Sequence, residues 1–189
     1  MIVKAEVLWL HRNANTHYTG GYPNGYLADI ETMYGIEPDA LHLFSGTIKD
    51  GLSIDFNRKL KPKICADAAH IPIKDNSIPR IYADPPYDEN YTQHYTDLRE
   101  HQPRTKSKYS AYSFVKECTR ILKPGGYLFI LHWLVYKSCF GLKFVQVIPV
   151  HNGPNHRIRA VTVLQKQGHL PNLKQWFETD KVLERESEA

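Results

Sequence analysis

The segment Asp84-Pro85-Pro86-Tyr87 directly follows an apolar run at residues 80–83 and contains the residues with the clearest chemical use. A carboxylate and a backbone carbonyl can each accept one hydrogen of an amino group and draw its nitrogen toward tetrahedral geometry. Asp84 and the Pro85 carbonyl would be these acceptors, because consecutive prolines fix the backbone before binding. Tyr87 would offer a flat face on which an extruded base can stack. The segment therefore predicts chemistry at an exocyclic amino nitrogen.

The same four residues also fit a structural role, because Pro-Pro commonly ends a strand in a rigid turn. The elements around the segment bear on this choice. Short apolar runs bounded by turn residues predict strands at 41–44, 52–56, 63–67 and 80–83. A continuous apolar run predicts a strand at 127–131 that is buried on both faces. Two more strands are expected at about 143–150 and 157–165, joined by a hairpin turn at 151–155.

Two helices of useful length are predicted. Asn24 would cap a helix over 25–35 that ends at Gly35. Ser110 or Ser113 would cap a second helix through Leu122, stopped by Pro124-Gly125-Gly126. A short helix is also expected near 173–177.

The connections after the first two predicted strands are short. Few residues separate Gly46 from Leu52, and few separate Phe56 from Lys63. A helical crossover between parallel strands needs about a dozen residues or more, so we predict abbreviated crossovers with almost no helix. One face of the neighbouring strands would then lack its usual cover. We expect the N-terminal segment or another subunit to shield it.

These features resemble, in kind and order, those of the class I S-adenosylmethionine-dependent amino-methyltransferases, which modify amino groups of adenine or cytosine. Asp84-Pro85-Pro86-Tyr87 matches their catalytic motif, so the resemblance makes Asp84, Pro85, Pro86 and Tyr87 the catalytic residues. Leu43-Phe44-Ser45-Gly46-Thr47 is similar to their cofactor loop, usually Phe-x-Gly-x-Gly, although Ile48 stands in place of the second glycine. The resemblance covers roughly residues 20–165.

The resemblance implies S-adenosylmethionine as the cofactor. Asp55 would bind its ribose hydroxyls, and Asp67-Ala68 with the following segment 71–77 would contact its adenine. The cofactor-binding residues expected on this basis are Phe44, Ser45, Gly46, Thr47, Asp55, Asp67 and Ala68. Considered singly, Gly46 could be a turn glycine, and both aspartates could be strand-terminal caps.

The predicted fold is α/β: a Rossmann-like class I methyltransferase sheet, mostly parallel with an antiparallel C-terminal hairpin. Its helices after strands 1 and 2 would be shortened or missing. Residues 122–126 resemble the turn that precedes the fifth strand in many such enzymes. We expect a single domain over 1–189, with a core at about 20–167 and a charged C-terminal tail at about 168–189.

Residues 87–109 combine aromatic and basic side chains beside the motif, which suits stacking and phosphate contacts. The expected substrate-binding residues are Tyr87, Tyr91, Tyr95, Arg99 and Arg104. Nearby acidic residues nearly balance the early positive charge, so a solvated loop is an equal alternative. The chain has no segment long enough for a separate recognition domain, so selectivity would come from loops or from a partner.

DNA adenine is the preferred target, with RNA adenine and cytosine or guanine amino nitrogens as alternatives; a protein side-chain amide also fits related motifs. Carbon-directed cytosine methylation is disfavoured, because no cysteine lies beside a proline in a comparable loop. A competing hypothesis is a cofactor-binding but inactive scaffold or regulatory subunit, motivated by Ile48 and the short crossovers.

The amino-acid composition favours some of these hypotheses and disfavours others. The chain has 189 residues and a formal charge of +4, which is compatible with a nucleic-acid partner, DNA or RNA, without requiring one. Its three cysteines are scattered, which disfavours a disulfide framework or a zinc site and favours a reducing, cytoplasmic compartment. Ten dispersed histidines predict no metal site. We expect no secretory signal, no membrane span, and either a homodimer or a recognition partner.

Overall fold

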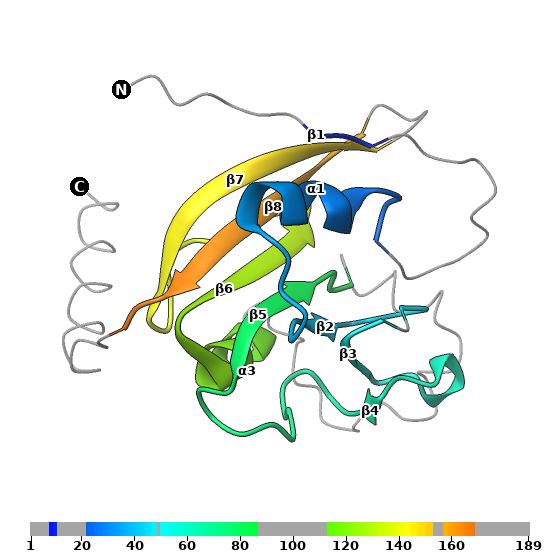
Figure 1. Ribbon diagram of the computed structural model, residues 1–189, viewed down its shortest axis with the longest axis vertical. Helices are drawn as coiled ribbons and strands as arrows, with labels where there is room; N and C mark the ends of the chain where they lie inside the picture. The colour runs from blue at the N-terminus through cyan, green and yellow to red at the C-terminus, as the bar shows by residue number, and fades with distance from the viewer. Residues whose placement is uncertain (1–7, 11–21, 49, 87–112, 153–156, 169–189) are drawn as a thin grey trace, which may run out of the picture.

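The computed structural model describes residues 8–10, 22–48, 50–86, 113–152 and 157–168, which are the coloured parts of Figure 1. They form an eight-stranded sheet in the order β1-β7-β8-β6-β5-β2-β3-β4. Its helices are α1 (Tyr26–Tyr34) and α3 (Ser113–Ile121). The strands are β1 (Leu8–Leu10), β2 (Leu41–Leu43), β3 (Leu52–Asp55), β4 (Ile64–Cys65), β5 (Ile78–Ala83), β6 (Leu122–His132), β7 (Leu142–Asn152) and β8 (Arg157–Lys166).

The directions of the strands confirm the predicted fold class. Strands β2 to β6 pair in parallel, and β1 pairs in parallel with β7. Strand β8 runs antiparallel to both of its neighbours, β6 and β7. The fold is therefore Rossmann-like, with a mostly parallel sheet that ends in an antiparallel C-terminal hairpin.

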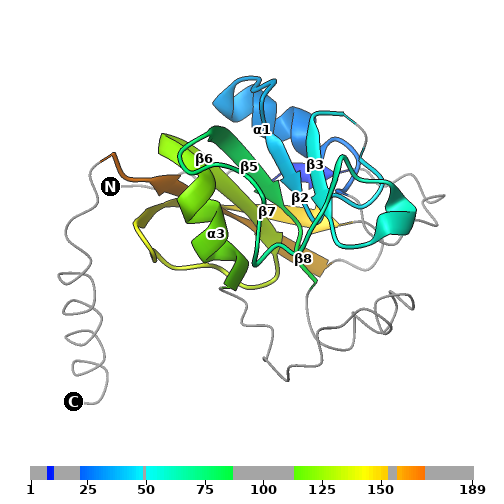
Figure 2. The same ribbon diagram turned by 90° about the horizontal axis from the view of Figure 1, so that it is seen from below.

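Helices α1 and α3 cover opposite faces of the sheet, as Figure 2 shows. Side chains alternate between the two faces along a strand, so Ile81 and Ala83 of β5 join the core under α3, whereas Tyr82 joins the core under α1. On the α1 face, Tyr26 and Ile30 are fully buried. Burial of each large apolar side chain contributes about 1.5–3 kcal/mol to stability, and these two cores hold the centre of the sheet rigid.

The predicted abbreviated crossovers are confirmed for the residues that the structure describes. The connection from β2 to β3 contains no helix in its described part, and the connection from β3 to β4 contains only a 3-10 turn, η1 (Arg58–Leu60). Asn57 caps this turn by accepting a hydrogen bond from the Lys59 backbone N–H at 3.0 Å. The Ser53 hydroxyl accepts another from the Lys63 backbone N–H at 3.0 Å. Single side chains therefore order the backbone where helices are missing.

The expected shielding by N-terminal residues is supported on β2. The Tyr22 ring lies 5.8 Å from the His42 ring, which in turn stacks on Tyr82 at 5.3 Å. His42 is only 7% exposed, and burial lowers its pKa, an effect that the Asp50 charge partly opposes. Tyr22 precedes α1 in the chain, so N-terminal residues do pack on this face.

The ends of several helices and strands differ from those predicted from the sequence. Helix α1 is preceded by Gly25 at φ 82 with no side-chain cap, so the predicted Asn24 cap is wrong, whereas Gly35 ends the helix as expected. Helix α3 ends one residue early, at Ile121. Strand β6 begins before the Pro-Gly-Gly turn at 124–126 and accommodates it as an irregularity in its pairing with β5. Strand β1 was not predicted. Most of the hairpin turn, the helix near 173–177 and Ser110 lie outside the described residues.

Candidate active site

The strand order places two predicted site segments side by side. The chain proceeds from β2 outward to β3 and β4, and then returns to the other side of β2 with β5. In open α/β sheets, ligands bind outside the carboxyl ends of the strands where the order reverses in this way. Leu43 and Ala83 are register partners at the ends of β2 and β5. The loops that begin at Phe44 and Asp84 therefore leave the same edge of the sheet next to each other.

The loop after β2 has an unusual backbone. Phe44 has φ 56 and Gly46 has φ 55, and a positive φ is a strained conformation for a bulky residue such as phenylalanine. The Phe44 ring packs edge-on against Phe114 of α3 at 5.4 Å, which holds it in place. The Ile48 backbone N–H donates to the Ser45 carbonyl at 3.0 Å, and Ile48 has no positive φ. The turn therefore has no need of a second glycine at this position.

Two groups, one in this loop and one at the end of β3, are suited to binding a polar ligand. Ser45 is 1% exposed, and its buried hydroxyl oxygen has no hydrogen-bond partner among the described residues. The Asp55 carboxylate, at the end of β3, accepts the Gly46 backbone N–H at 2.9 Å and the Asn57 backbone N–H at 2.8 Å. A carboxylate offers about four acceptor positions, so these two bonds do not exhaust it. Thr47 lies exposed at the tip of the turn.

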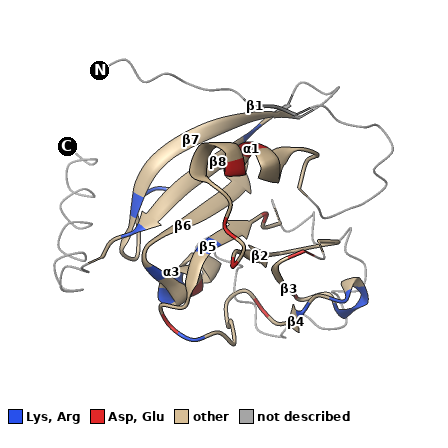
Figure 3. Ribbon diagram, in the orientation of Figure 1, with Lys and Arg blue, Asp and Glu red and all other residues tan. Residues whose placement is uncertain are grey.

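The third expected cofactor segment lies at the same edge. The Ala66 backbone N–H donates to the Asp55 carbonyl at 3.2 Å, which ties the end of β4 to the end of β3. Asp67 follows, with its side chain 32% exposed, and accepts the Ala69 backbone N–H at 2.9 Å. Ala68 is buried in the α3-side core together with Leu43. In Figure 3 the ends of β3 and β5 are acidic, whereas η1 is basic.

The predicted catalytic motif begins at the end of β5. The side chain of Asp84 is 13% exposed, Pro85 is buried and Pro86 is half-buried. A guanidinium nitrogen of Arg159, on β8, lies 3.9 Å from an Asp84 carboxylate oxygen. Burial raises the pKa of Tyr22, and the negative charge of Asp84 raises it further, so the Tyr22 hydroxyl stays protonated.

His132, the last residue of β6, contacts the same motif from the neighbouring strand. It is 2% exposed, and burial lowers its pKa to about 4, although its hydrogen bond to the Pro86 backbone acts in the opposite direction. Its Nδ1 accepts the Leu134 backbone N–H at 2.8 Å. Sequence reasoning missed both His132 and Arg159. The strand alternation at 157–165 contained a signal, because Arg159 shares the parity of the buried Val161 and Val163.

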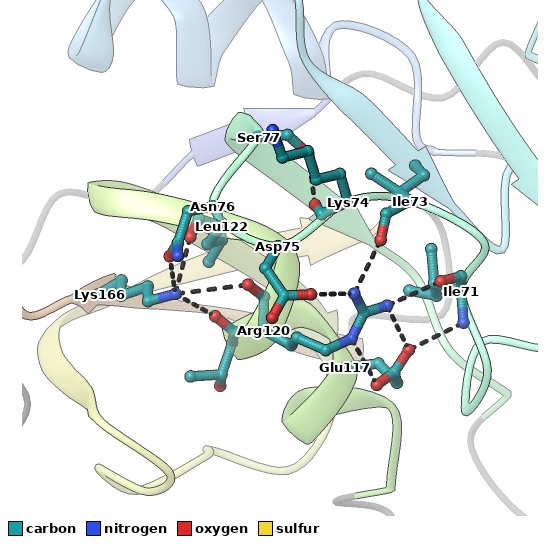
Figure 4. A network of polar contacts seen from close by, with 11 residues as sticks. Ile71, Ile73, Lys74, Asp75, Asn76, Ser77, Glu117, Arg120, Leu122 and Lys166 are labelled. Carbon is teal, nitrogen blue, oxygen red and sulfur yellow. Dashed lines mark hydrogen bonds and ion pairs between the residues drawn. The ribbon is translucent and has the colours of Figure 1, made fainter.

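A polar network supports the segment that resembles an adenine-contacting region (Figure 4). Arg120 of α3 donates to the Ile71 and Ile73 carbonyls, both at 2.7 Å, and pairs with Asp75 at 2.6 Å. Glu117 accepts the Ile71 backbone N–H at 2.9 Å, and hydrogen bonds from Arg120 lower the pKa of this carboxyl group. No pattern in the sequence indicated that α3 would anchor this segment.

Lys166 of β8 completes this network (Figure 4). Its ammonium group donates to the Thr119 carbonyl at 2.7 Å and the Leu122 carbonyl at 2.8 Å, and to the Asn76 side-chain oxygen at 2.7 Å. Cations are favourable at a helix C-terminus, where the last carbonyls lack helical partners. Lys166 therefore joins the end of α3 to the sheet and to the loop before β5.

The predicted site also includes residues outside the described ranges. Those that lie outside the described residues are Tyr87, Tyr91, Tyr95, Arg99 and Arg104. Among the predicted cofactor residues, the structure brings Ser45, Gly46 and Asp55 together directly, with Asp67 at the same edge of the sheet.

Comparison with known proteins adds a fold likeness. No protein-family model matches the chain, and no curated protein matches it. Solved structures of similar fold include an S-adenosylmethionine-dependent methyltransferase from Methanosarcina mazei, 12% identical with a TM-score of 0.48 over 73% of this chain and 97% of that chain. Another, from Aquifex aeolicus, is 14% identical with a TM-score of 0.43 over 73% and 88%. Such low identities do not indicate a substrate, so the site must support any functional proposal.

Proposed function

We propose that this chain is an S-adenosylmethionine-dependent methyltransferase that acts on an exocyclic amino group of a nucleic-acid base, with adenine in DNA as the preferred target. One observation carries the proposal. The Asp84-Pro85-Pro86 segment and the Ser45-Gly46 loop leave neighbouring strands, β5 and β2, at the point where the strand order reverses. A donor bound at one loop would lie beside an acceptor bound at the other.

The cofactor residues fit a nucleoside that carries hydroxyl groups. The Ser45 hydroxyl is buried with no hydrogen-bond partner in the described structure, and Asp55 keeps acceptor positions beyond its two backbone bonds. Together with Asp67, they would hold the ribose and adenine of S-adenosylmethionine. This cofactor has no phosphates and less need of a helix N-terminus, which agrees with the helix-poor crossovers. When bound, it supplies an electrophilic methyl group.

The residues of the motif would prepare the amino nitrogen. Its lone pair is delocalised into the base, which makes it a poor nucleophile. The Asp84 carboxylate and the Pro85 carbonyl would each accept one amino hydrogen and favour tetrahedral geometry at nitrogen. Asp84 would also take up the proton that the nitrogen releases as it gains the methyl group. Tyr87, outside the described residues, is proposed to stack on the base, and Tyr91, Tyr95, Arg99 and Arg104 are proposed to contact the nucleic acid.

A labelling panel tests this function. The protein is incubated with methyl-labelled S-adenosylmethionine and duplex DNA, single-stranded DNA, RNA or protein, and the labelled nucleosides are identified. We expect N6-methyladenine from DNA, and loss of at least about 100-fold of the rate in Asp84→Ala. Asp39→Ala, which removes an exposed carboxylate before β2, serves as the matched control. Cofactor binding without transfer to any substrate would instead indicate an inactive scaffold.

A further inference from the structure

Arg159 reaches Asp84 across an intervening strand. Strand β6 lies between β8 and β5, and neighbouring strands are about 4.7–4.9 Å apart, so the two backbones are separated by roughly 10 Å. Only a long side chain can cover this distance. Val161 and Val163 lie in the α1-side core, and Arg159 follows their alternation, as Asp84 follows that of Tyr82. The pair therefore forms on the α1 side of the sheet.

Water screens this pair only weakly. The side chains of Asp84 and Arg159 are 13% and 16% exposed, and their closest charged atoms are 3.9 Å apart. Exposed ion pairs contribute little, whereas a charge left without its partner in a buried position is strongly disfavoured. Arg159 therefore favours the ionised carboxylate, which is the form that accepts amino hydrogens.

His132 holds the motif from the other side. Ile130 of β6 lies in the α3-side core, and His132 follows its alternation, with its ring 5.9 Å from that of Tyr136 in the same core. Its Nδ1 accepts the Leu134 backbone N–H, which leaves Nε2 as the donor of a neutral ring. Proline has no backbone N–H, so the bond between His132 and the Pro86 backbone is made to the Pro86 carbonyl oxygen. This bond fixes the residue that follows Pro85.

We propose that Arg159 and His132 are positioning residues, which hold the Asp84 carboxylate and the Pro85-Pro86 backbone in the geometry required for transfer to an amino nitrogen. The inference rests on the proposed function and deepens it. The two contacts come from opposite sides of the sheet, so each restrains a different acceptor. A displacement of about 1 Å can reduce the rate of a positioned reaction by about 100-fold. These residues therefore affect turnover more than substrate or cofactor binding.

Kinetics of matched variants test the proposal. Arg159→Met and His132→Phe are each expected to lower kcat by about 100-fold, with KM and the affinity for S-adenosylhomocysteine within about threefold. Arg159→Lys keeps the charge and His132→Asn keeps a donor. The kcat of each is therefore expected to be at least tenfold higher than that of Arg159→Met or His132→Phe, respectively. Lys143→Met, which removes an exposed cation at the amino end of β7, is the control and is expected to keep the wild-type rate. The proposal would be overturned if the decrease in kcat were no larger than the decrease in the folded fraction of the protein. It would also be overturned if a conservative variant had the same kcat as its disruptive counterpart.

A second measurement is independent of activity. The pKa of Asp84 is measured by carboxyl-carbon NMR in the wild type and in Arg159→Met. Tyr22 also faces Asp84, so Tyr22→Phe is titrated beside them. A higher pKa in Arg159→Met supports the role of Arg159 even if no substrate is methylated, in which case only the proposed function fails. An unchanged pKa contradicts that role even in an active enzyme.

Discussion

The two halves of the sheet are stabilised by different kinds of contact. Strands β6, β7 and β8 have 10 or 11 residues, and helices α1 and α3 pack against the part of the sheet built around them. Strands β2, β3 and β4 have only two to four residues, joined by connections with almost no helix. The long half is a packed frame, and the short half holds most of the proposed cofactor residues.

The difference shows that the edge where the cofactor is proposed to bind is ordered with little regular secondary structure. In the short half, side chains such as Asp55 and Ser53 bond to backbone groups of the next connection. In the long half, large side chains interlock on both faces. Substitutions of buried frame residues should therefore unfold the whole chain, whereas substitutions of the polar side chains that order the short connections should loosen the site locally.

The largest change in the free energy of unfolding is expected for a substitution in the frame. Phe129 of β6 is fully buried and packs against Tyr34 at 4.9 Å and Tyr82 at 5.3 Å. Phe129→Ala should lower the free energy of unfolding by about 3–5 kcal/mol, measured by denaturant titration. Phe140→Ala removes a ring that is 46% exposed and should cost less than about 1 kcal/mol. Similar losses for both would contradict the assignment of the frame.

The next effect is a dependence of stability on pH that originates at the end of β6. Burial lowers the pKa of His132 from 6.5 to about 4, so the unfolded chain binds a proton more readily than the folded chain between these values. Its contribution to stability is therefore present above about pH 6.5 and is lost as the pH falls toward 4, by about 2–3 kcal/mol. His132→Asn should reduce the difference in unfolding free energy between pH 7 and pH 4.5. His70→Asn, at a side chain 86% exposed, should leave it unchanged.

A smaller, local effect is expected in the short half. Asp55→Ala removes the acceptor of the Gly46 and Asn57 backbone N–H groups and should cost about 1–3 kcal/mol. Hydrogen exchange should become faster at these two amides but not in β6 or β8. Uniform acceleration across the sheet would show that the two halves open together. Asp39→Ala is the control, because its carboxylate is exposed.

The smallest effect concerns the turn into β3. Gly51 has φ +68, and an added Cβ would lie 3.3 Å from the His42 ring. Gly51→Ala should therefore lower the unfolding free energy by roughly 1–2 kcal/mol. Gly168→Ala, with open space around the new methyl group and no positive φ, is the control and should have no measurable effect. A neutral Gly51→Ala would show that this turn adjusts freely.

The positions of the strands and the lengths of their connections could be predicted from the sequence, because they depend on hydrophobic periodicity and residue spacing. The apolar runs located β2 to β8 to within a few residues, and the short spacing after Gly46 was sufficient to predict crossovers with almost no helix. The motif at 84–87 and the resemblance to amino-methyltransferases identified the segments that meet at the ends of β2 and β5, where parallel strands bring their carboxyl ends to one edge. Whether those residues bind S-adenosylmethionine stays a prediction.

Contacts between distant parts of the chain could not be predicted in this way. Arg159 and Asp84 are far apart in sequence, and their pairing depends on β8 lying beside β6 rather than at the edge. The anchoring of residues 71–75 by Arg120 likewise depends on how α3 packs against the sheet. The Asn24 cap was wrong because the left-handed Gly25 immediately precedes the helix.

No helix in the described part of the chain is long and apolar enough to cross a membrane.

The two outermost strands, β1 and β4, have only three and two residues. An outer strand presents unpaired N–H and C=O groups that can recruit a strand from another molecule, and the number of these groups grows with strand length. The border at β4 therefore offers few groups for such recruitment, whereas at the other border β1 pairs with β7 only from Val150 to Asn152. Among the described residues, the rest of β7 is paired on one side only, by β8, so a strand recruited from another molecule would add at residues 142–149.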